Sequence, residues 1–178
     1  MTGHDRPLTA RVEALREGVR RVNAKLPDLP AREVVLMRML CLLGWEFTTN
    51  LDRRLRKHGL NDTDFRTLMV LFSSPDGMAH PSDLCHLVTL SRTNMTRIGD
   101  VLVARGLVTR TPSLEDRRRI VMRITAKGEA LVRKLVPPLY PVLTALFADF
   151  GVREKRQLEA LLLRLAAAFD AVDFRKES

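Results

Sequence analysis

The sequence predicts a mainly α-helical chain with one small β-hairpin. Three observations indicate this fold class. Apolar residues recur at helical spacing through most of the chain, two short helical segments meet at a tight connection near residue 90, and the apolar period changes from 3.6 to 2 after Gly106. Because two short helices followed by a hairpin define a winged helix-turn-helix, we expect that architecture, with the terminal helices forming a dimerisation region.

The first helical segment covers residues 8–26. Its apolar residues follow a 4-3-4-3-4 spacing and form one stripe that needs a partner: Leu8, Val12, Leu15, Val19, Val22 and Leu26. A long second helix begins just after Pro30 and ends at His58-Gly59, where glycine supplies a C-terminal cap. We therefore expect an N-terminal helical extension over residues 1–30 and the first part of the dimerisation region over residues 31–60.

Residues 61–124 are predicted to form the winged helix-turn-helix lobe, which is expected to bind DNA. Asn61 and the two residues after it offer N-cap chemistry for one helix, and Pro81-Ser82 opens a short second helix. Ser91 begins a third helix that stops at Arg105-Gly106. The short second and third helices are the predicted helix-turn-helix.

Two strand-like segments, residues 107–111 and 119–124, complete the lobe because their apolar residues alternate. The helical pattern then returns, with a bend implied by three prolines, and a last helix starts at about Val152. Residues 125–178 are assigned, with residues 31–60, to the dimerisation region. The last helix carries an apolar stripe that a second copy of the N-terminal stripe would bury: Leu158, Leu161, Leu165 and Phe169.

The composition describes one basic globular domain. The 178 residues include 30 Lys and Arg against 21 Asp and Glu, a net charge of +9, and 46% are hydrophobic, which excludes a mainly disordered chain. Residues 91–124 contain eight arginines and only three acidic residues. This local excess is an electrostatic footprint for a polyanion, and the alternative is an ordinary solvated charged face.

The sequence further predicts a soluble cytoplasmic protein with no membrane partner. No apolar run approaches the 18 or more residues of a membrane span, and no signal peptide is recognisable. Cys41 and Cys85 lack the spacing of a zinc site or a disulfide framework, which fits a reducing compartment. The four histidines also show no metal spacing, so we expect neither metal nor cofactor.

The third lobe helix carries, in its N-terminal half, the residues that we expect to bind DNA: Ser91, Arg92, Thr93, Asn94, Thr96 and Arg97, of which all but Ser91 are expected to read bases. Ile98, Val101 and Leu102 are expected to face inward, as in a recognition helix. Either arginine can make a bidentate contact to guanine, Asn94 can read adenine, and the threonines can meet a thymine methyl or a phosphate. The alternative is that Ser91 only caps the helix and that the arginines are solvated.

Further DNA contacts are expected from the hairpin tip and from the start of the short second helix. An arginine at the tip, Arg117 or Arg118, can enter the minor groove, while Asp116 holds a neighbouring arginine by a charge-assisted pair. Pro81 and Ser82 are expected to contact phosphate through a helix N-terminus, which sets register without reading sequence.

Three motifs carry a resemblance to a known family: Gly106-Leu107-Val108, Asp116-Arg117-Arg118 and Ile124-Thr125-Ala126-Lys127-Gly128. On these motifs the sequence resembles the MarR family of winged-helix transcriptional regulators over roughly residues 31–172. Ser91-Arg92-Thr93-Asn94 and Val136-Pro137-Pro138 look most like its EmrR/MprA branch, which regulates multidrug efflux operons.

The resemblance implies a homodimer with interlocked terminal helices that binds double-stranded DNA at a pseudo-palindromic operator. It also implies repression of an efflux or stress-response operon, relieved by small aromatic, phenolic or lipophilic compounds. Met95 is larger than the residue that the resemblance leads us to expect at its position.

In the resembled family, effectors bind between the long helix and the DNA-binding lobe. The residues expected to line that pocket here are Cys41, Trp45, Thr48, Phe65 and Met69. A core or dimer-interface role is the alternative for Trp45 and for the Met and Phe residues. Oxidation sensing by Cys41 is disfavoured, because Cys41 is predicted to lie mid-helix among apolar residues and the single tyrosine, Tyr140, lies in another helix.

No enzyme motif is present, since the sequence contains no GxSxG, P-loop, GxGxxG or HExxH. Two non-enzyme alternatives remain beside a specific regulator: a nonspecific basic architectural DNA binder and a helical interaction module. A specific repressor prefers its operator by about 10³-fold or more, whereas an architectural protein does not. Failure to bind duplex DNA would favour the interaction module.

Overall fold

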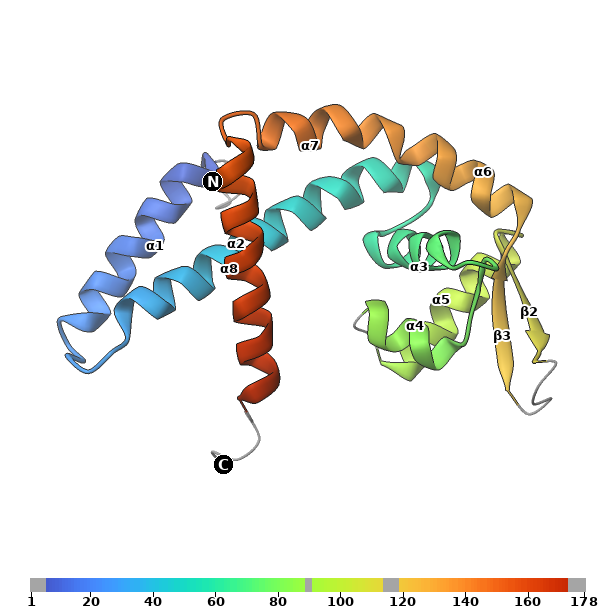
Figure 1. Cartoon of the computed structure of the whole chain (residues 1–178), viewed down its shortest axis with the longest axis horizontal. Coiled ribbons are helices and arrows are strands. Elements are labelled where there is room, and N and C mark those ends of the chain that lie inside the picture. The colour runs from blue at the N-terminus through green and yellow to red at the C-terminus, as the bar shows by residue number, and fades with distance from the viewer. Residues whose placement is uncertain (1–5, 89–90, 114–118, 173–178) are drawn as a thin grey trace. The chain divides into compact units, whose positions relative to one another are not determined.

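The computed structural model describes residues 6–88, 91–113 and 119–172 (Figure 1). The chain forms two compact units, residues 1–125 and 126–178. The first unit holds a helical hairpin and the lobe with the β-sheet, and the second is wholly helical in its described part. The mainly helical fold with a small antiparallel sheet confirms the predicted fold class.

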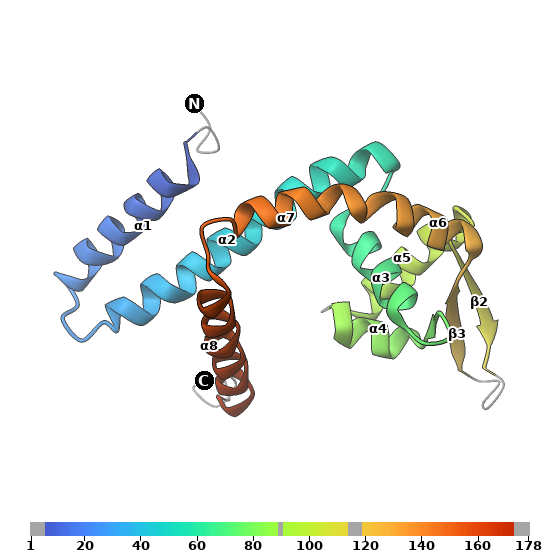
Figure 2. The same ribbon diagram turned by 45° about the horizontal axis from the view of Figure 1, so that its top comes forward.

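Helices α1 (Leu8–Asn23) and α2 (Ala31–Leu55) form the hairpin and pack side by side (Figure 2). The Arg11 guanidinium lies 2.7 Å from the Glu46 carboxylate and 5.1 Å from the centre of the Trp45 ring, so one α1 side chain makes two polar contacts to α2. Val19 is buried, whereas Val22 is 44% exposed. The N-terminal stripe is thus covered only in part within its own chain.

Helix α2 continues into a 3₁₀ turn, η1 (Arg56–His58), and ends at Gly59, whose φ of 66° is left-handed. Among the residues that the structure describes, this one helix, Ala31–His58, is long and apolar enough to cross a membrane by composition, with a mean hydropathy of 1.2 over 18 residues. The helix contains no unbroken apolar run of that length, because Arg38 and Glu46 interrupt it. The finding is weak evidence for a membrane, because a packing helix of a soluble protein passes the same test.

The lobe follows with α3 (Asp62–Ser73), α4 (Pro81–Val88) and α5 (Arg92–Ala104), which lie together beside the β-hairpin in Figure 1. Strands β2 (Val108–Pro112) and β3 (Ile120–Ile124) pair antiparallel, with Val108 opposite Ile124 and Pro112 opposite Ile120.

A short strand that the sequence analysis missed, β1 (Met78–Ala79), pairs with the other edge of β3 and gives the sheet order β1-β3-β2. Two residues are too few to show an alternating pattern, so this strand can be recognised only from its pairing with β3.

The lobe's core is built from apolar residues of every one of its longer elements. Those with no exposed surface are Leu68, Leu71, Leu84, Val88, Ile98, Leu102 and Met122. Because they come from α3, α4, α5 and β3, the core holds α5 against the sheet.

Asn61 begins α3 with a capping box. Its side-chain oxygen accepts a hydrogen bond from the Asp64 backbone N–H at 2.8 Å, and the Asp64 carboxylate accepts one from the Asn61 N–H at 3.1 Å. We expect Asn61→Ala to lower the free energy of unfolding by about 0.5–2 kcal/mol. Thermal unfolding at fixed protein concentration checks this. The control is Gln157→Ala at an exposed position inside the last helix, Val152–Ala171, where alanine favours the helix, and an equal loss in both variants would contradict the capping role.

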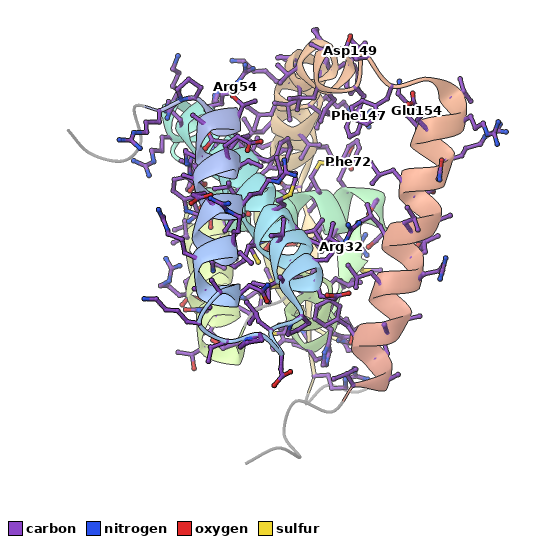
Figure 3. The ribbon with its side chains drawn as sticks, turned by 90° about the vertical axis from the view of Figure 1, so that its left-hand side faces the viewer. Arg32, Arg54, Phe72, Phe147, Asp149 and Glu154 are labelled. Carbon is purple, nitrogen blue, oxygen red and sulfur yellow. The ribbon has the colours of Figure 1, made fainter. Side chains whose placement is uncertain are left out.

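The second unit contains α6 (Ala126–Leu135), the 3₁₀ turn η2 (Pro137–Leu139), α7 (Tyr140–Leu146) and α8 (Val152–Ala171). The predicted proline bend is found at η2. The Gly151 N–H donates to the Glu154 carboxylate at 2.7 Å and starts α8 (Figure 3).

Helix α8 is covered very little within the single chain. Leu158, Leu161 and Phe169 are 37%, 50% and 46% exposed, and Leu165 is half-buried. A helix with an uncovered apolar stripe gains little stability by itself.

Candidate nucleic-acid interface

Helix α5 presents one polar face and one buried face. Ser91 is its N-cap, with the side-chain oxygen 3.3 Å from the Asn94 backbone nitrogen that donates to it. Met95, Ile98 and Leu102 are at most 1% exposed. The other described side chains of its first half are exposed: Thr93, Asn94, Thr96 and Arg97.

This arrangement has two consequences for the predicted contacts. Arg97 makes no hydrogen bond or ion pair with the described residues, so its guanidinium is available to a ligand. Met95, which stands out in the sequence for its size, is a core residue and leaves the exposed face to its polar neighbours. The base contact of Arg92 stays a prediction, because its side chain is not among those that the structure describes.

Arg110 of β2 holds the middle of α5. Its guanidinium pairs with the Asp100 carboxylate and donates to the Thr96 carbonyl oxygen at 2.8 Å. A Cβ at Gly99 would overlap that guanidinium, so glycine permits the close approach. The wing strand and the recognition helix are therefore joined by a directional polar contact as well as by apolar packing.

Three arginines of residues 91–124 make bonds within the fold and keep their positive charge. Arg123 of β3 donates to the Asp76 carbonyl oxygen at 2.9 Å, and Arg105 donates to two carbonyls at the end of η1. Together with Arg110, these arginines fasten the lobe. In the sequence alone they belong to the predicted polyanion footprint, because their partners are distant in the chain.

The start of α4 is less suited to phosphate than the sequence suggested. Ser82 is exposed and Pro81 is half-exposed, but the Ser82 hydroxyl lies 3.2 Å from the Asp83 carboxylate. That carboxylate occupies the positive end of the helix dipole, where a phosphate would bind. His80 and the Ile120 carbonyl oxygen, 2.9 Å apart, join this start to β3.

The hairpin tip with Asp116, Arg117 and Arg118 lies outside the described residues. The Ser113 N–H donates to the Arg119 carbonyl oxygen at 2.8 Å and continues the ladder toward the tip. The wing role of these three residues stays a prediction.

The predicted effector residues lie on two helices. Cys41 and Trp45 are exposed on α2, and Thr48 donates a hydrogen bond to the Gly44 carbonyl oxygen of its own helix. Phe65 is buried and Met69 half-buried on α3.

The Trp45 ring is approached by Arg11 from α1, and an open groove of about 900 Å³ lies between α1 and α2. That groove is lined by none of the predicted effector residues. Within the described part of the chain, no three His, Cys, Asp or Glu side chains gather as metal ligands.

A two-helix motif with an exposed polar recognition face, flanked by a β-hairpin, defines a winged-helix DNA-binding protein. Residues 58–119 match the model of the MarR family. The transcriptional repressor MprA of Escherichia coli K12 is 33% identical over 146 residues, which cover 82% of this chain and 83% of MprA. The chain belongs to the MarR family of transcriptional regulators, which are DNA-binding proteins and not enzymes.

Solved structures support the fold. The MarR-family regulator AbsC from Streptomyces coelicolor matches with a TM-score of 0.69 and 22% identity, over 77% of this chain and 93% of AbsC. A mutant of E. coli MarR complexed with operator DNA matches with a TM-score of 0.67 and 22% identity, over 78% of this chain and 98% of that one. The predicted resemblance and the predicted absence of enzymatic activity are thereby confirmed, and the family indicates a soluble protein.

Proposed function

We propose that this protein is a cytoplasmic, homodimeric repressor that binds a pseudo-palindromic operator and controls an efflux or stress-response operon. The exposed polar face of α5 opposite a buried apolar face carries the proposal, because it presents hydrogen-bonding side chains such as Thr93, Asn94 and Arg97 to solvent. The similarity to a protein named as a transcriptional repressor supports the direction of regulation.

The proposed DNA contacts divide into base readout and positioning. Thr93, Asn94 and Arg97 on α5 contact base edges, together with their neighbours Arg92 and Thr96. The wing arginines Arg117 and Arg118 bind at the minor groove, where the negative potential is deepest. Ser91, Pro81 and Ser82 fix register through the backbone, although Asp83 weakens the contact at α4.

The dimer would bury the stripes that a single chain leaves exposed. Val22 on α1 and Leu158, Leu161 and Phe169 on α8 are the clearest cases, since each is more than a third exposed. In this proposal, residues 31–60 and 125–178 form the dimerisation region with the extension 1–30, and residues 61–124 form the DNA-binding lobe.

The proposed effector is a small aromatic or lipophilic compound that binds near Trp45, Cys41 and Thr48 of α2 and Phe65 and Met69 of α3. It releases DNA only if it binds more tightly to the state whose recognition helices are wrongly spaced. Arg11 lies over one face of Trp45, so an effector would reach the ring from another side or displace that guanidinium.

Fluorescence anisotropy tests the proposal with DNA from upstream of the protein's own gene and with scrambled DNA at about 150 mM salt. A preference of about 10³-fold or more that salicylate or a lipophilic uncoupler abolishes is the expected result. Equal binding of both DNAs would favour the architectural alternative. If the protein prefers the operator but neither compound releases the DNA, the repressor function stands and the proposed class of effector is wrong.

The wing prediction concerns salt dependence. Arg118→Ala is expected to weaken operator and scrambled DNA alike, and to reduce the slope of log affinity against log salt by about 1, because one phosphate-facing charge is lost. Anisotropy titrations at several salt concentrations measure it. Arg133→Ala on α6 removes the same charge elsewhere and is expected to leave the slope unchanged. A change confined to the operator would contradict the assignment.

A further inference from the structure

Arg105 connects the recognition helix to the far end of the long helix α2. It follows α5 directly and donates hydrogen bonds to the His58 carbonyl oxygen at 2.6 Å and to the Gly59 carbonyl oxygen at 2.5 Å. Those carbonyls lie at the C-terminal end of the 3₁₀ turn η1, 47 and 46 residues earlier in the chain. The contact therefore joins two elements that the chain itself separates by the whole helix-turn-helix.

The chemistry of both partners suits this contact. The last carbonyls of a helix have no partner within it, and a cation is favourable at that end of the helix dipole. Gly59 turns the chain at a φ of 66°, and a Cβ placed on it would lie 3.4 Å from Arg105 Nη1, so the guanidinium rests directly against the turn. A planar guanidinium can donate to two neighbouring carbonyls at once, which a lysine ammonium does less well.

We infer that Arg105 is a positioning residue for DNA recognition, because it sets where the C-terminal end of α5 lies relative to α2. This inference rests on the proposed role of α5 in reading bases. Apolar packing through Met95, Ile98 and Leu102 holds α5 against the core but is not directional. The polar contacts at Arg110 and Arg105 fix its middle and its end.

Arg105 differs from an arginine that binds phosphate. Both of its terminal nitrogens already donate to backbone carbonyls, and the residue is half-buried. Its replacement should therefore change the preference for the operator and leave nonspecific, salt-dependent binding as it was.

The test compares full-length wild type with Arg105→Met and Arg105→Lys by anisotropy on operator and scrambled DNA over a range of salt. We expect Arg105→Met to bind the operator about tenfold more weakly, which corresponds to the lower end of what one lost charged hydrogen bond produces. Its affinity for scrambled DNA should fall no more than that of the charge-matched control Arg66→Met, its salt slope should match wild type, and Arg105→Lys should recover part of the loss. Stoichiometric titration of the active fraction separates weaker binding from misfolded protein.

Arg66→Met is the matched control, because Arg66 pairs with Asp62 inside α3 at 2.8 Å and joins no other element through that pair. An operator preference retained in Arg105→Met would overturn the inference, and so would an equal loss in Arg66→Met. A reduced salt slope would make Arg105 a phosphate contact and overturn it as well. If the wild-type protein itself shows no preference for the operator, the proposed function fails. If the wild type has the preference and Arg105→Met keeps it, only the inference about Arg105 fails.

Discussion

Replacing Ile98 by alanine is expected to lower the free energy of unfolding by about 2–5 kcal/mol. Ile98 has no exposed surface, and its helix packs against α3, α4 and β2. Truncation removes buried apolar surface and leaves a cavity that the surrounding elements can close only in part. Chemical unfolding followed by circular dichroism, at one fixed protein concentration, measures the change.

Ile120→Ala is the control for this prediction. Ile120 lies on β3 and is 42% exposed, so the same substitution there should cost less than about 1 kcal/mol. If the two variants lost the same stability, the inner face of α5 would not be part of the core. For Ile98→Ala, we also expect operator and scrambled DNA to be affected together, through the fraction of folded protein.

Replacing Arg97, which precedes Ile98, is expected to change DNA affinity and leave stability almost unchanged. Arg97→Ala should weaken operator binding by about 1–3 kcal/mol, roughly 5–150-fold, because a bidentate contact to guanine is lost. Stability should change little, since Arg97 is exposed and pairs with none of the described residues. Anisotropy on operator and scrambled DNA measures the ratio of affinities.

Arg66→Ala removes the same charge from α3 and controls for net charge. It should lower both affinities slightly and leave their ratio unchanged. An Arg97→Ala variant that lost as much on scrambled DNA as on the operator would show that Arg97 contacts phosphate instead of bases. If instead the loss is confined to the operator, single base-pair substitutions in the operator locate the contact, because Arg97→Ala should tolerate a change at the base pair that the wild type reads.

Much of the fold follows from residues that are close in sequence. The 3.6-residue period marks the helices, and the change of period after Gly106 marks β2 and β3, because side chains alternate along a strand. Asn61 and Ser91 mark two helix starts through hydrogen bonds that span three residues. The outward face of α5 follows in the same way from the apolar spacing of its inner face.

The arginines of residues 91–124 show where reading the sequence fails. They form one basic run in the sequence, but Arg105, Arg110 and Arg123 bond to groups 10 to 47 residues away and hold the lobe together. Arg97 looks the same in the sequence, yet it alone of these four has a side chain that the described fold leaves available. Sequence composition gives the number of charges, and it cannot distinguish an arginine that bonds within the fold from one that is available to DNA.

The order of the longer helices and strands, the polar face of α5 and the resemblance to a regulator family can be predicted from the amino-acid sequence, because periodicity, caps and motifs are properties of neighbouring residues. The pairing of β1 with β3, the position of Arg11 over the Trp45 ring, and the bonds from Arg105 to the end of α2 are known from the folded structure alone. Each of these contacts joins segments far apart in the chain, and such contacts exist only once the chain has folded.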